Sequence, residues 1–443
     1  MNTPAFQRLV GLLLLLGLVL PAAAQQTGEG SVYSRFGLGS RILYASSQQQ
    51  AMGGGGVALS NLNYLNLSNP ATWSAQVLTR ASGSVLFQRL WATDASGNTS
   101  RLGFGALQAV HLSFPLRTRR IGLGLAFRPY TRANYLVRTS ALLAHPDLGD
   151  TIRYQIDYAG EGGLQQLNAG VGVYVHPQLS VGLRADLIFG IIEHTQRTRF
   201  FDPDLPGLIP TEYAPTLFAT STRLAGVRAT AGLLFRLPLS DQQTSDALTL
   251  GVTFSTPTTL RATRVYTLGE SLDRDTLKTA LHGDVYLPLS VAWGVSYQQD
   301  NRWTFVLDGL YEPWSRFRSD LPFAGYTPNG ENLFKDFVRL SAGLEYLPAG
   351  TDYSAPYFHQ VAYRIGLYWE RAYVDPSPEV SLRTLAVTAG LSFPTLFPGT
   401  RLDVNLTAGM RGTTAYNLVR DVYYRIGLSL NVGERWFLQR RFN

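Results

Sequence analysis

Apolar and polar residues alternate with a period of two along most of the chain after about residue 79. The clearest stretch runs from residue 179 to residue 190, and its apolar face carries Leu179, Val181, Leu183, Ala185, Leu187 and Phe189. A period of two is typical of a β-strand with one apolar and one polar face. After residue 24, no stretch approaches the run of about eighteen apolar residues that a membrane-spanning helix needs. The pattern therefore predicts an all-β protein.

Fourteen alternating segments can be counted, and the connections between them differ in length. We place the segments near residues 87, 109, 125, 168, 185, 230, 252, 292, 307, 342, 366, 388, 406 and 427. Every second connection is mostly tight, whereas others are long, at about 132–150, 194–220, 264–285 and 313–336. Long loops at one end are typical of transmembrane antiparallel β-barrels in bacterial outer membranes, where the long loops are extracellular. An even strand number then places both termini in the periplasm.

Aromatic residues of the apolar faces concentrate near the ends of the expected strands. Near the tight turns lie Tyr297, Trp303, Tyr346 and Tyr363, and near the long loops lie Trp91, Tyr311 and Trp369. We expect these residues to form two girdles at the level of the lipid headgroups. The alternative, the core of a soluble β-sandwich, gives no reason for this spacing or for long loops at one end.

The first 24 residues have the pattern of a secretory signal peptide. A positive start at Arg8 precedes an apolar run from Leu9 to Leu20, and small residues follow before Gln25. The alternative, an anchor helix, is disfavoured because this run is too short for a hydrocarbon core of about 30 Å. We therefore expect a signal peptide at 1–24, an N-terminal hatch at 25–78, a barrel at 79–432 and a periplasmic tail at 433–443.

Composition and motifs argue against an enzymatic reaction and against a metal or cofactor site. The chain has no Cys, which excludes a disulfide scaffold, a thiolate metal site, a Cys nucleophile and a lipid-modified N-terminal Cys. Its six His form no metal-ligand pair, and neither a phosphate-binding Gly-x-x-x-x-Gly-Lys motif nor a Gly-x-Ser-x-Gly motif occurs. We expect no catalytic residue, metal or cofactor. The basic pI of about 9.5 favours contact with acidic membrane lipids over nucleic acid.

Charged residues concentrate on the polar faces, which a barrel turns toward its lumen. The predicted lumen charges are Arg128, Arg184, Asp186, Arg228, Asp308, Arg339, Glu345, Arg364 and Arg425. We favour a cross-strand ladder of ion pairs over a selectivity filter, because both signs occur on neighbouring strands. We also expect Arg at lipid-facing Leu123 or Leu183 to damage assembly, and Ser at lumen-facing Gly124 to be far milder.

Several segments resemble the FadL/TodX family of outer-membrane channels for hydrophobic compounds. The predicted hatch contains Gly53, Gly54, Gly55 and Gly56 within Met52 to Leu59, followed by Asn69, Pro70 and Ala71. The run from Leu287 to Phe317 is similar to paired strands of that family, and so are Gly343 to Tyr346 and Arg364 to Leu367. The residues Ser31 to Gly39 and Glu434 to Asn443 are similar to the Bacteroidota-type branch.

The resemblance implies a fourteen-stranded barrel that is plugged by its N-terminal segment and passes apolar molecules sideways into the membrane. Our first functional hypothesis is therefore passive uptake of fatty-acid-like or aromatic small molecules, with membrane lipids as surroundings. The alternative is a structural subunit of a secretion or assembly complex with other outer-membrane proteins, because some members of that branch have this role. A third class, an outer-membrane lipid hydrolase, would need a Ser and a His meeting at the barrel rim, and no motif indicates one.

Pro129 interrupts the third expected strand. Pro lacks the N–H group that a closed ladder needs, so we expect a bulge, a kink or the end of the strand there. The resemblance implies a wall distortion opposite the hatch, which would join Pro129 and residues 69–71 in one lateral exit. The alternative is that Pro129 marks where the strand leaves the membrane toward the loop at 132–150.

Overall fold

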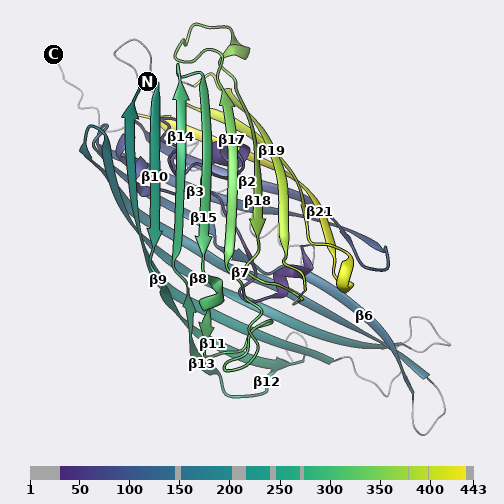
Figure 1. Cartoon of the computed structure of the whole chain (residues 1–443). Helices are drawn as coiled ribbons and strands as arrows, with labels where there is room; N and C mark the ends of the chain where they lie inside the picture. The colour runs from purple at the N-terminus through teal and green to yellow at the C-terminus, as the bar shows by residue number, and fades with distance from the viewer. Residues whose placement is uncertain are drawn as a thin grey trace.

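The computed structural model describes residues 30–144, 151–201, 216–239, 246–269, 274–377, 379–397 and 399–435. It is a closed antiparallel β-barrel with fourteen strand positions (Figure 1). The first wall strand, β2 (Thr79–Thr93), pairs with the last, β21 (Arg420–Glu434), over their whole lengths. Closure leaves no free sheet edge at this seam, as a lipid environment requires. The predicted fold class is confirmed. The predicted signal peptide and residues 436–443 of the predicted tail lie outside the described residues.

The wall strands between these two follow one another around the barrel in chain order. They are β3 (Thr99–Arg117), β4 (Ile121–Pro129) with β6 (Tyr135–Ala144), β7 (Thr151–His176), β8 (Leu179–Phe201), β9 (Thr216–Pro238), β10 (Ala247–Ser255) with β11 (Thr258–Leu268), β13 (Leu281–Leu287) with β14 (Ser290–Gln299), β15 (Trp303–Glu312), β17 (Phe337–Tyr346), β18 (Ala362–Arg371), β19 (Arg383–Pro394) and β20 (Arg401–Arg411).

The remaining elements are short. They are η1 (Val32–Arg35), β1 (Ser40–Arg41), α2 (Ser47–Ala51), η2 (Pro70–Ala75), β5 (Thr131–Arg132), β12 (Asp275–Thr276), η4 (Trp314–Arg316), β16 (Arg318–Ser319), η5 (Tyr357–His359) and η6 (Ala415–Asn417). Among the described residues, no helix combines the length and the apolar composition that crossing a bilayer requires.

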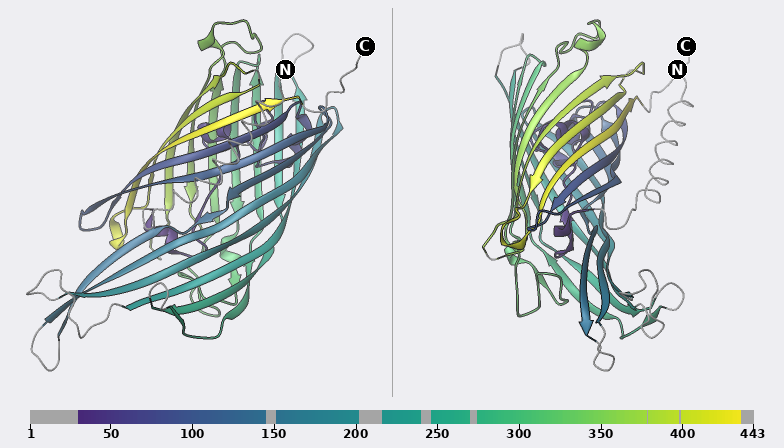
Figure 2. Two further views of the ribbon diagram at one scale, coloured as in Figure 1. Left: turned by 180° about the vertical axis from the view of Figure 1, so that it is seen from behind. Right: turned by 90° about the vertical axis from the view of Figure 1, so that its right-hand side faces the viewer.

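The two ends of the barrel differ, and we name them by their connections. The turn end is where β2 begins and β21 ends, with tight turns at 118–120 and 300–302. The loop end is opposite, and β6 to β9 project from it beyond the rest of the wall (Figure 2). Parts of the predicted loops 132–150, 194–220 and 264–285 are therefore strand. The period-two pattern misses these parts because strands that leave the lipid lose the contrast between their faces.

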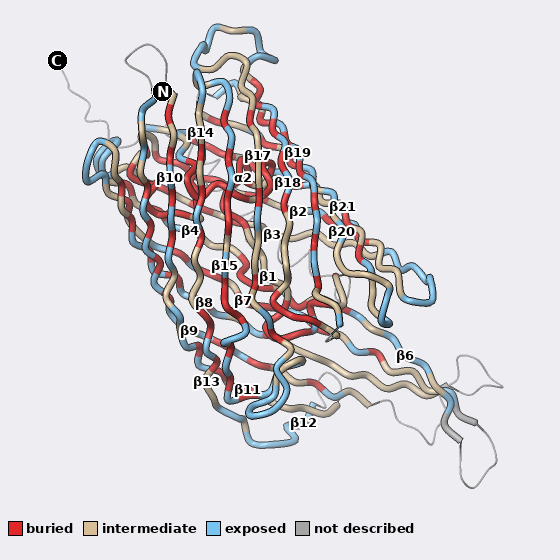
Figure 3. Tube along the Cα trace, in the orientation of Figure 1, coloured by how far each residue is buried: buried red, intermediate tan, exposed pale blue. Residues whose placement is uncertain are grey.

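The two faces of the wall have opposite chemistry, and buried and exposed residues alternate along the strands (Figure 3). Outward Leu183 is 64% exposed, whereas its neighbour Arg184 is buried. Lipid would cover such outward apolar side chains, because the described residues form no second layer outside the wall. At the turn end, the rings of Trp303 and Tyr346 stack with their centroids 4.1 Å apart, consistent with the predicted girdle.

The third strand position is broken. The ladder of β4 with β7 ends at Pro129, and the ladder of β6 with β7 begins at Tyr135. Between them β5 turns inward and pairs with β1 of the N-terminal segment. On the other side, the ladder of β3 with β4 ends at Val110, and in the described part of the chain β6 pairs with β7 alone. We call this separation of β3 from β6 the wall break.

The N-terminal segment fills much of the barrel interior. Residues 30–78 lie inside the ring of strands in both views of Figure 2, where they are drawn in purple. Most of this segment is buried although it has little regular structure, and Leu38, Met52 and Trp73 have no exposed surface. We call residues 30–78 the plug.

Candidate functional site

The four predicted hatch glycines form a tight turn after α2. Gly53, Gly54 and Gly56 have φ angles of 78°, 76° and 118°, in the left-handed region that favours glycine. A Cβ atom on Gly53 would lie 2.5 Å from the backbone oxygen of Leu367 in the wall. One on Gly55 would be equally crowded by wall side chains. The run is therefore a turn pressed against the wall.

Asn69, Pro70 and Ala71 begin the short helix η2. The side chain of Asn69 accepts a hydrogen bond from the backbone N–H of Ala71, and Pro70 occupies a position that needs no N–H. The amide of Asn69 also donates to the backbone oxygens of Val57 in the plug, at 3.0 Å, and Leu233 in β9, at 3.1 Å. Asn69 thus fixes both the helix start and its place against the wall.

Glycines on the inner wall allow the plug to touch the barrel backbone. A Cβ atom on Gly182 would lie 2.3 Å from the carbonyl carbon of Pro70, and one on Gly366 would lie 2.3 Å from the amide nitrogen of Gly53. The same holds around much of the barrel, and we call this group the glycine belt: Gly122, Gly124, Gly172, Gly182, Gly232, Gly251, Gly343, Gly366 and Gly390. Ser at Gly124, predicted to be far milder than Arg at Leu123 or Leu183, would bring its Cβ to 2.8 Å from the Trp73 ring, so this substitution carries a packing cost that the sequence pattern does not show.

Buried wall charges anchor the plug through hydrogen bonds. Arg364 pairs with Glu345 at 2.5 Å and with Asp403 at 3.4 Å, and it donates to the hydroxyl of Tyr64 in the plug at 2.9 Å. The amide of Gln48 in α2 donates to both oxygens of Glu345, at 3.0 and 2.9 Å. Charge-assisted bonds of this kind offset the unfavourable burial of the ions.

Two further anchors bind plug backbone. Arg184 pairs with Asp186 at 2.6 Å, and its guanidinium also donates to the backbone oxygen of Leu67. Arg128 donates in the same way to the backbone oxygen of Tyr44. Irregular plug backbone has carbonyl groups that no sheet satisfies, and these arginines supply the missing donors.

The other predicted lumen charges also form hydrogen bonds or ion pairs with nearby residues of the plug or the wall. Asp308 accepts a hydrogen bond from the N–H of Val57 at 2.7 Å. Arg339 binds Glu370 and the backbone oxygen of Gly53, Arg228 binds the backbone oxygens of Thr256 and Pro288, and Arg425 binds Gln88. Some of these contacts join adjacent strands, as a ladder would, but most of the predicted residues hold the plug.

Plug residues that the sequence pattern missed complete these contacts. Arg41 forms a bidentate pair with Glu312, at 2.7 and 3.1 Å, and Trp314 donates to the same carboxylate at 2.8 Å. The sequence pattern does not distinguish Gln48 or Tyr64 either. Plug residues follow no strand or helix period, so only their polarity inside a mostly apolar segment could have indicated such a role.

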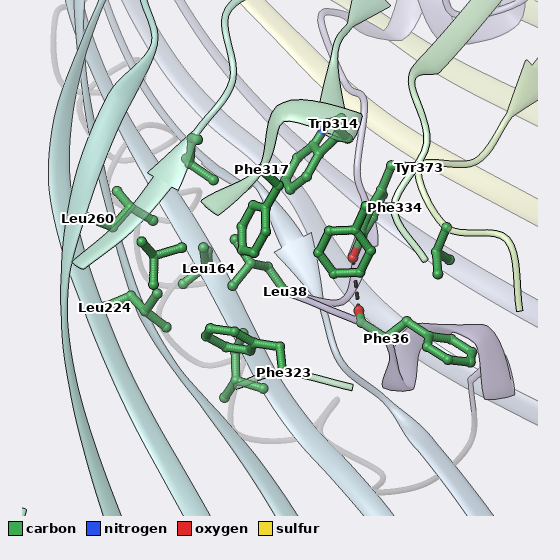
Figure 4. Packing of buried hydrophobic residues seen from close by; sticks show 14 of the residues in the cluster. Phe36, Leu38, Leu164, Leu224, Leu260, Trp314, Phe317, Phe323, Phe334 and Tyr373 are labelled. Atoms are coloured by element: carbon green, nitrogen blue, oxygen red, sulfur yellow. Dashed lines mark hydrogen bonds between the residues drawn. The ribbon is translucent and has the colours of Figure 1, made fainter. Parts of the chain in front are cut away.

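A buried, mostly aromatic cluster fills the lumen toward the loop end (Figure 4). Phe36 and Leu38 of the plug pack there against residues 313–336, which fold back into the barrel. The rings of Trp314 and Tyr373 stack at 4.4 Å, and the Tyr373 hydroxyl donates to the backbone oxygen of Phe36 at 2.9 Å. We call this cluster the lid core: Tyr33, Phe36, Leu38, Trp314, Phe317, Phe323, Phe334 and Tyr373.

Two small cavities lie between the lid core and the glycine belt, separated by plug residues 41–44, which line both. The first has a volume of about 130 Å³, reaches the wall break at Phe104 and Leu107, and is lined by five arginines: Arg41, Arg132, Arg339, Arg411 and Arg425. We call it the arginine cavity. The second, of about 120 Å³, is lined among others by Arg128, Arg184, Asp186, Arg228, Asp308 and Glu312.

The structure separates the two parts of the predicted lateral exit. Pro129 lies where the strand leaves the wall, and the segment that it leads to pairs with Ser40 and Arg41. Asn69 instead contacts β9 through Leu233. Pro129 therefore lies at an interruption of the wall. The plug element that packs beside this interruption is β1, not residues 69–71.

Apolar side chains are exposed at the turn end, on two neighbouring connections. The Tyr357 hydroxyl joins these connections by donating to the backbone oxygen of Pro394 at 3.2 Å. We call the group the turn-end patch, and its exposed fractions are 89% for Tyr353, 51% for Tyr357, 71% for Phe358, 99% for Leu396 and 64% for Phe397. Contiguous exposed apolar residues commonly mark an interaction surface.

A closed fourteen-strand barrel with an apolar outer face and an internal N-terminal plug defines a class of bacterial outer-membrane protein. A protein-family model described as BamG matches residues 6–443. The chain therefore belongs to the BamG family. That match names no bacterial lineage, so the similarity to a Bacteroidota-type branch stays a prediction. None of the curated protein sequences compared with the chain matches it.

Solved structures with a similar fold are outer-membrane channels. The chain resembles the CymD monoaromatic hydrocarbon channel at 14% identity and a TM-score of 0.52, over 89% of this chain and 99% of that one. It resembles a Pseudomonas aeruginosa FadL homologue at 14% identity and a TM-score of 0.54, over 88% and 98%. The P. putida toluene transporter TodX gives 15% identity and a TM-score of 0.53, over 90% and 100%.

The TM-scores show a shared fold, in agreement with the predicted resemblance to FadL/TodX barrels, and at 14–15% identity they show the fold alone. The structural neighbours are transport channels, not enzymes. Within the described ranges, no group of three or more acidic or His side chains could hold a metal ion.

Proposed function

We propose that this barrel is a structural subunit of a protein complex in the outer membrane, with its turn end in the periplasm. The turn-end patch is the observation that carries the proposal. Tight turns at this end need no apolar side chains, yet Leu396 and Phe397 are 99% and 64% exposed. Apolar surface of this kind is stabilised when a partner removes it from water.

The barrel interior supports a structural role over passive uptake of apolar molecules. The plug touches the wall backbone at the glycine belt, and the lid core fills the loop end. The arginine cavity between them would force a neutral hydrocarbon to displace water from charged guanidinium groups. A channel for such compounds needs a continuous apolar path, and these linings oppose one.

Site-specific photo-cross-linking in intact cells tests the docking role. A photoreactive residue at Phe397 should give a discrete protein adduct, whereas one at Tyr416 should give none. Tyr416 is a matched control because it is 60% exposed but lies at the loop end. The double variant Leu396→Ser/Phe397→Ser should lose co-purifying proteins that Tyr416→Ser retains, while heat-dependent gel mobility shows both barrels folded. Equal recovery of partners by both variants would contradict the proposal.

A second function, lateral passage of hydrophobic small molecules, is favoured by the wall break alone. The break interrupts the wall at the height of the arginine cavity, beside Phe104 and Leu107. Ser34 of the plug spans this region by exchanging hydrogen bonds of 3.1 and 3.0 Å with the backbone of Asn134. Movement of the plug away from β6 would open a side route.

A reversible cross-link separates the two functions. The pair Ser34→Cys/Asn134→Cys places two thiols where the structure has a hydrogen-bonded contact. For a lateral route, oxidation should abolish uptake of an apolar fluorescent probe by proteoliposomes, and reduction should restore it. For the structural role that we favour, uptake should stay at the level of empty liposomes in both states.

A further inference from the structure

The part of the wall that projects from the loop end carries a group of arginines on its outward face (Figure 1). In β8, Arg197 and Arg199 share their parity, and therefore their face, with the lipid-facing residues of that strand. The ladders place Arg197 opposite Asp157 of β7, and Asp157 opposite Arg138 of β6. Arg153 lies four residues from Asp157 on the same face of β7. We call this group the projection cluster: Arg138, Arg153, Asp157, Arg197 and Arg199.

The acidic member of the cluster is Asp157, and it holds the arginines in place. Its carboxylate is buried and pairs with Arg138 at 2.9 Å and with Arg199 at 3.9 Å. The amide of Gln155 donates to the same carboxylate at 2.8 Å. The arginine side chains remain open to their surroundings, with exposed fractions of 57% for Arg138 and 39% for Arg199. Because one carboxylate cannot neutralise four arginines, the cluster keeps a positive charge.

Acidic residues closer to the barrel do not change this balance. Glu161 and Glu193 lie opposite each other, four residues nearer the membrane than the row of Asp157, which is about 13 Å along the strands. Glu193 already pairs with Arg274 at 2.7 Å. The projection cluster therefore remains basic, and planar guanidinium groups bind phosphate and carboxylate oxygens through two parallel hydrogen bonds.

The cluster continues the lipid-facing side of the wall beyond the apolar band. The outward apolar run of β8 that includes Leu183 ends at Ile191, which is 43% exposed and lies six residues before Arg197. Six residues span about 20 Å of strand, and a tilt of about 35–45° converts this to about 15 Å of height. A phospholipid headgroup layer is only about 5–8 Å deep. The cluster therefore lies above phospholipid headgroups, at the height of a larger saccharide headgroup.

We propose that the projection cluster binds anionic groups, phosphates or sugar carboxylates, on the saccharide headgroup of a glycolipid in the outer leaflet. The acyl chains of this glycolipid pack below the cluster, against outward residues such as Leu187 and Ile191. An acidic protein would suit the same charges, but the continuity of this face with the lipid-facing side of β8 favours the lipid. The assignment rests on the proposed orientation, in which the loop end is extracellular. It does not rest on partner docking, because the turn-end patch lies at the opposite end of the barrel.

Cysteine labelling of intact cells tests the orientation separately. The chain has no Cys, so Arg153→Cys introduces a single thiol into the projection. A maleimide attached to a polyethylene glycol too large to cross the outer membrane should label this thiol. Protection in intact cells, with labelling after lysis, would overturn the assignment to the outer leaflet.

Native mass spectrometry of the purified full-length protein in a neutral detergent tests the class of ligand. Deep-rough lipopolysaccharide, whose short saccharide carries phosphates and carboxylates, should give discrete adducts at micromolar concentration. Phosphatidylglycerol, which carries one phosphate on a short headgroup, should bind at least about tenfold more weakly because it offers fewer oxyanions to the cluster. Equal binding of phosphatidylglycerol would overturn the assignment to a saccharide headgroup. Displacement of lipopolysaccharide by an added acidic polypeptide but not by excess lipid would favour a protein ligand and overturn the proposal.

Paired variants locate the binding on the barrel. Arg138→Gln/Arg199→Gln should weaken lipopolysaccharide binding by about tenfold or more, because two charge-assisted contacts are lost. Arg117→Gln/Arg120→Gln removes the same charge from exposed positions at the turn end and should bind normally. Heat-dependent gel mobility checks that both barrels are folded. Equal weakening by the two double variants would indicate attraction to net charge alone, and unchanged affinity in the Arg138/Arg199 variant would place the lipid elsewhere; either result would overturn the proposal. Leu396→Ser/Phe397→Ser should keep full affinity for lipopolysaccharide, so a failure of the docking role is measured independently.

Discussion

The two ends of the barrel interior are closed by opposite kinds of packing. At the glycine belt, the plug lies against wall backbone and is held by buried ions such as Arg364 and Glu345. At the lid core, aromatic rings from the plug and from residues 313–336 pack together without ion pairs among them. Backbone contact tolerates no added atom, whereas a ring cluster can partly relax around a loss. We therefore expect changes at the glycine belt to affect assembly of the whole barrel. Changes in the lid core should affect only the stability of the loop end.

The largest effect should come from adding volume at the belt. Gly182→Val would place atoms within about 2.3 Å of the backbone between Pro70 and Ala71. Overpacking costs about 1–3 kcal/mol where side chains can move, and more where rigid backbone must shift. We expect loss of the folded, heat-modifiable form. The control is Gly427→Ala at another inner glycine, whose Cβ would have its nearest neighbour at 3.3 Å, the side-chain oxygen of Gln108. A normal yield for Gly182→Val would show that the plug is not packed as described.

Removing a buried cation should have the next largest effect. Arg364→Met leaves Glu345 and Asp403 without their shared partner in a buried site, and breaking such a pair typically costs about 3–5 kcal/mol. Chemical denaturation in detergent should show this loss. The double variant Arg364→Met/Glu345→Gln should recover part of the stability because it buries one charge fewer. Equal stability of the single variant and the unaltered protein would argue that these ions are hydrated.

A core truncation at the other end should act locally. Phe334→Ala removes a fully buried ring from the lid core, a change that costs about 3–5 kcal/mol in a rigid core. Here residues 313–336 can move away from the plug, so we expect a folded barrel with faster proteolysis of that segment. Phe358→Ala, which truncates an exposed ring of the turn-end patch, should leave the proteolysis rate unchanged. Global unfolding of the Phe334 variant would remove the distinction between the two ends.

The smallest effect should come from the contact between the plug and the wall break. Ser34→Ala deletes the hydroxyl that bonds to the Asn134 backbone, and a single hydrogen bond of this kind contributes about 0.5–1.5 kcal/mol. Hydrogen exchange at the start of β6 should rise severalfold, while exchange in β8 stays constant. If Ser34→Ala left the exchange rate at the start of β6 unchanged, as in β8, the plug would not stabilise this edge of the wall.

Sequence patterns predicted the wall better than its contents. Alternation at residues 179–190 identifies a strand and its lipid-facing side, because the bilayer imposes one chemistry on one face over the whole strand. Pro129 predicted an interruption because proline has no N–H to donate to the neighbouring strand in a closed sheet. The strand β6 was instead predicted as a loop, since outside the membrane nothing imposes that contrast.

By itself, the sequence determined the fold class, the two faces of the wall and the position of the break, since each depends on local backbone chemistry or on contact with solvent and lipid. Tertiary structure alone decided which residues meet inside. The contacts of Arg364 with Tyr64 and of Arg41 with Glu312 join residues 300 and 271 positions apart. An irregular plug has no period that could predict such pairs. The role of Gly182, which is to leave room for the plug backbone at Pro70, likewise depends on tertiary structure. The sequence does not show which segment packs against a glycine.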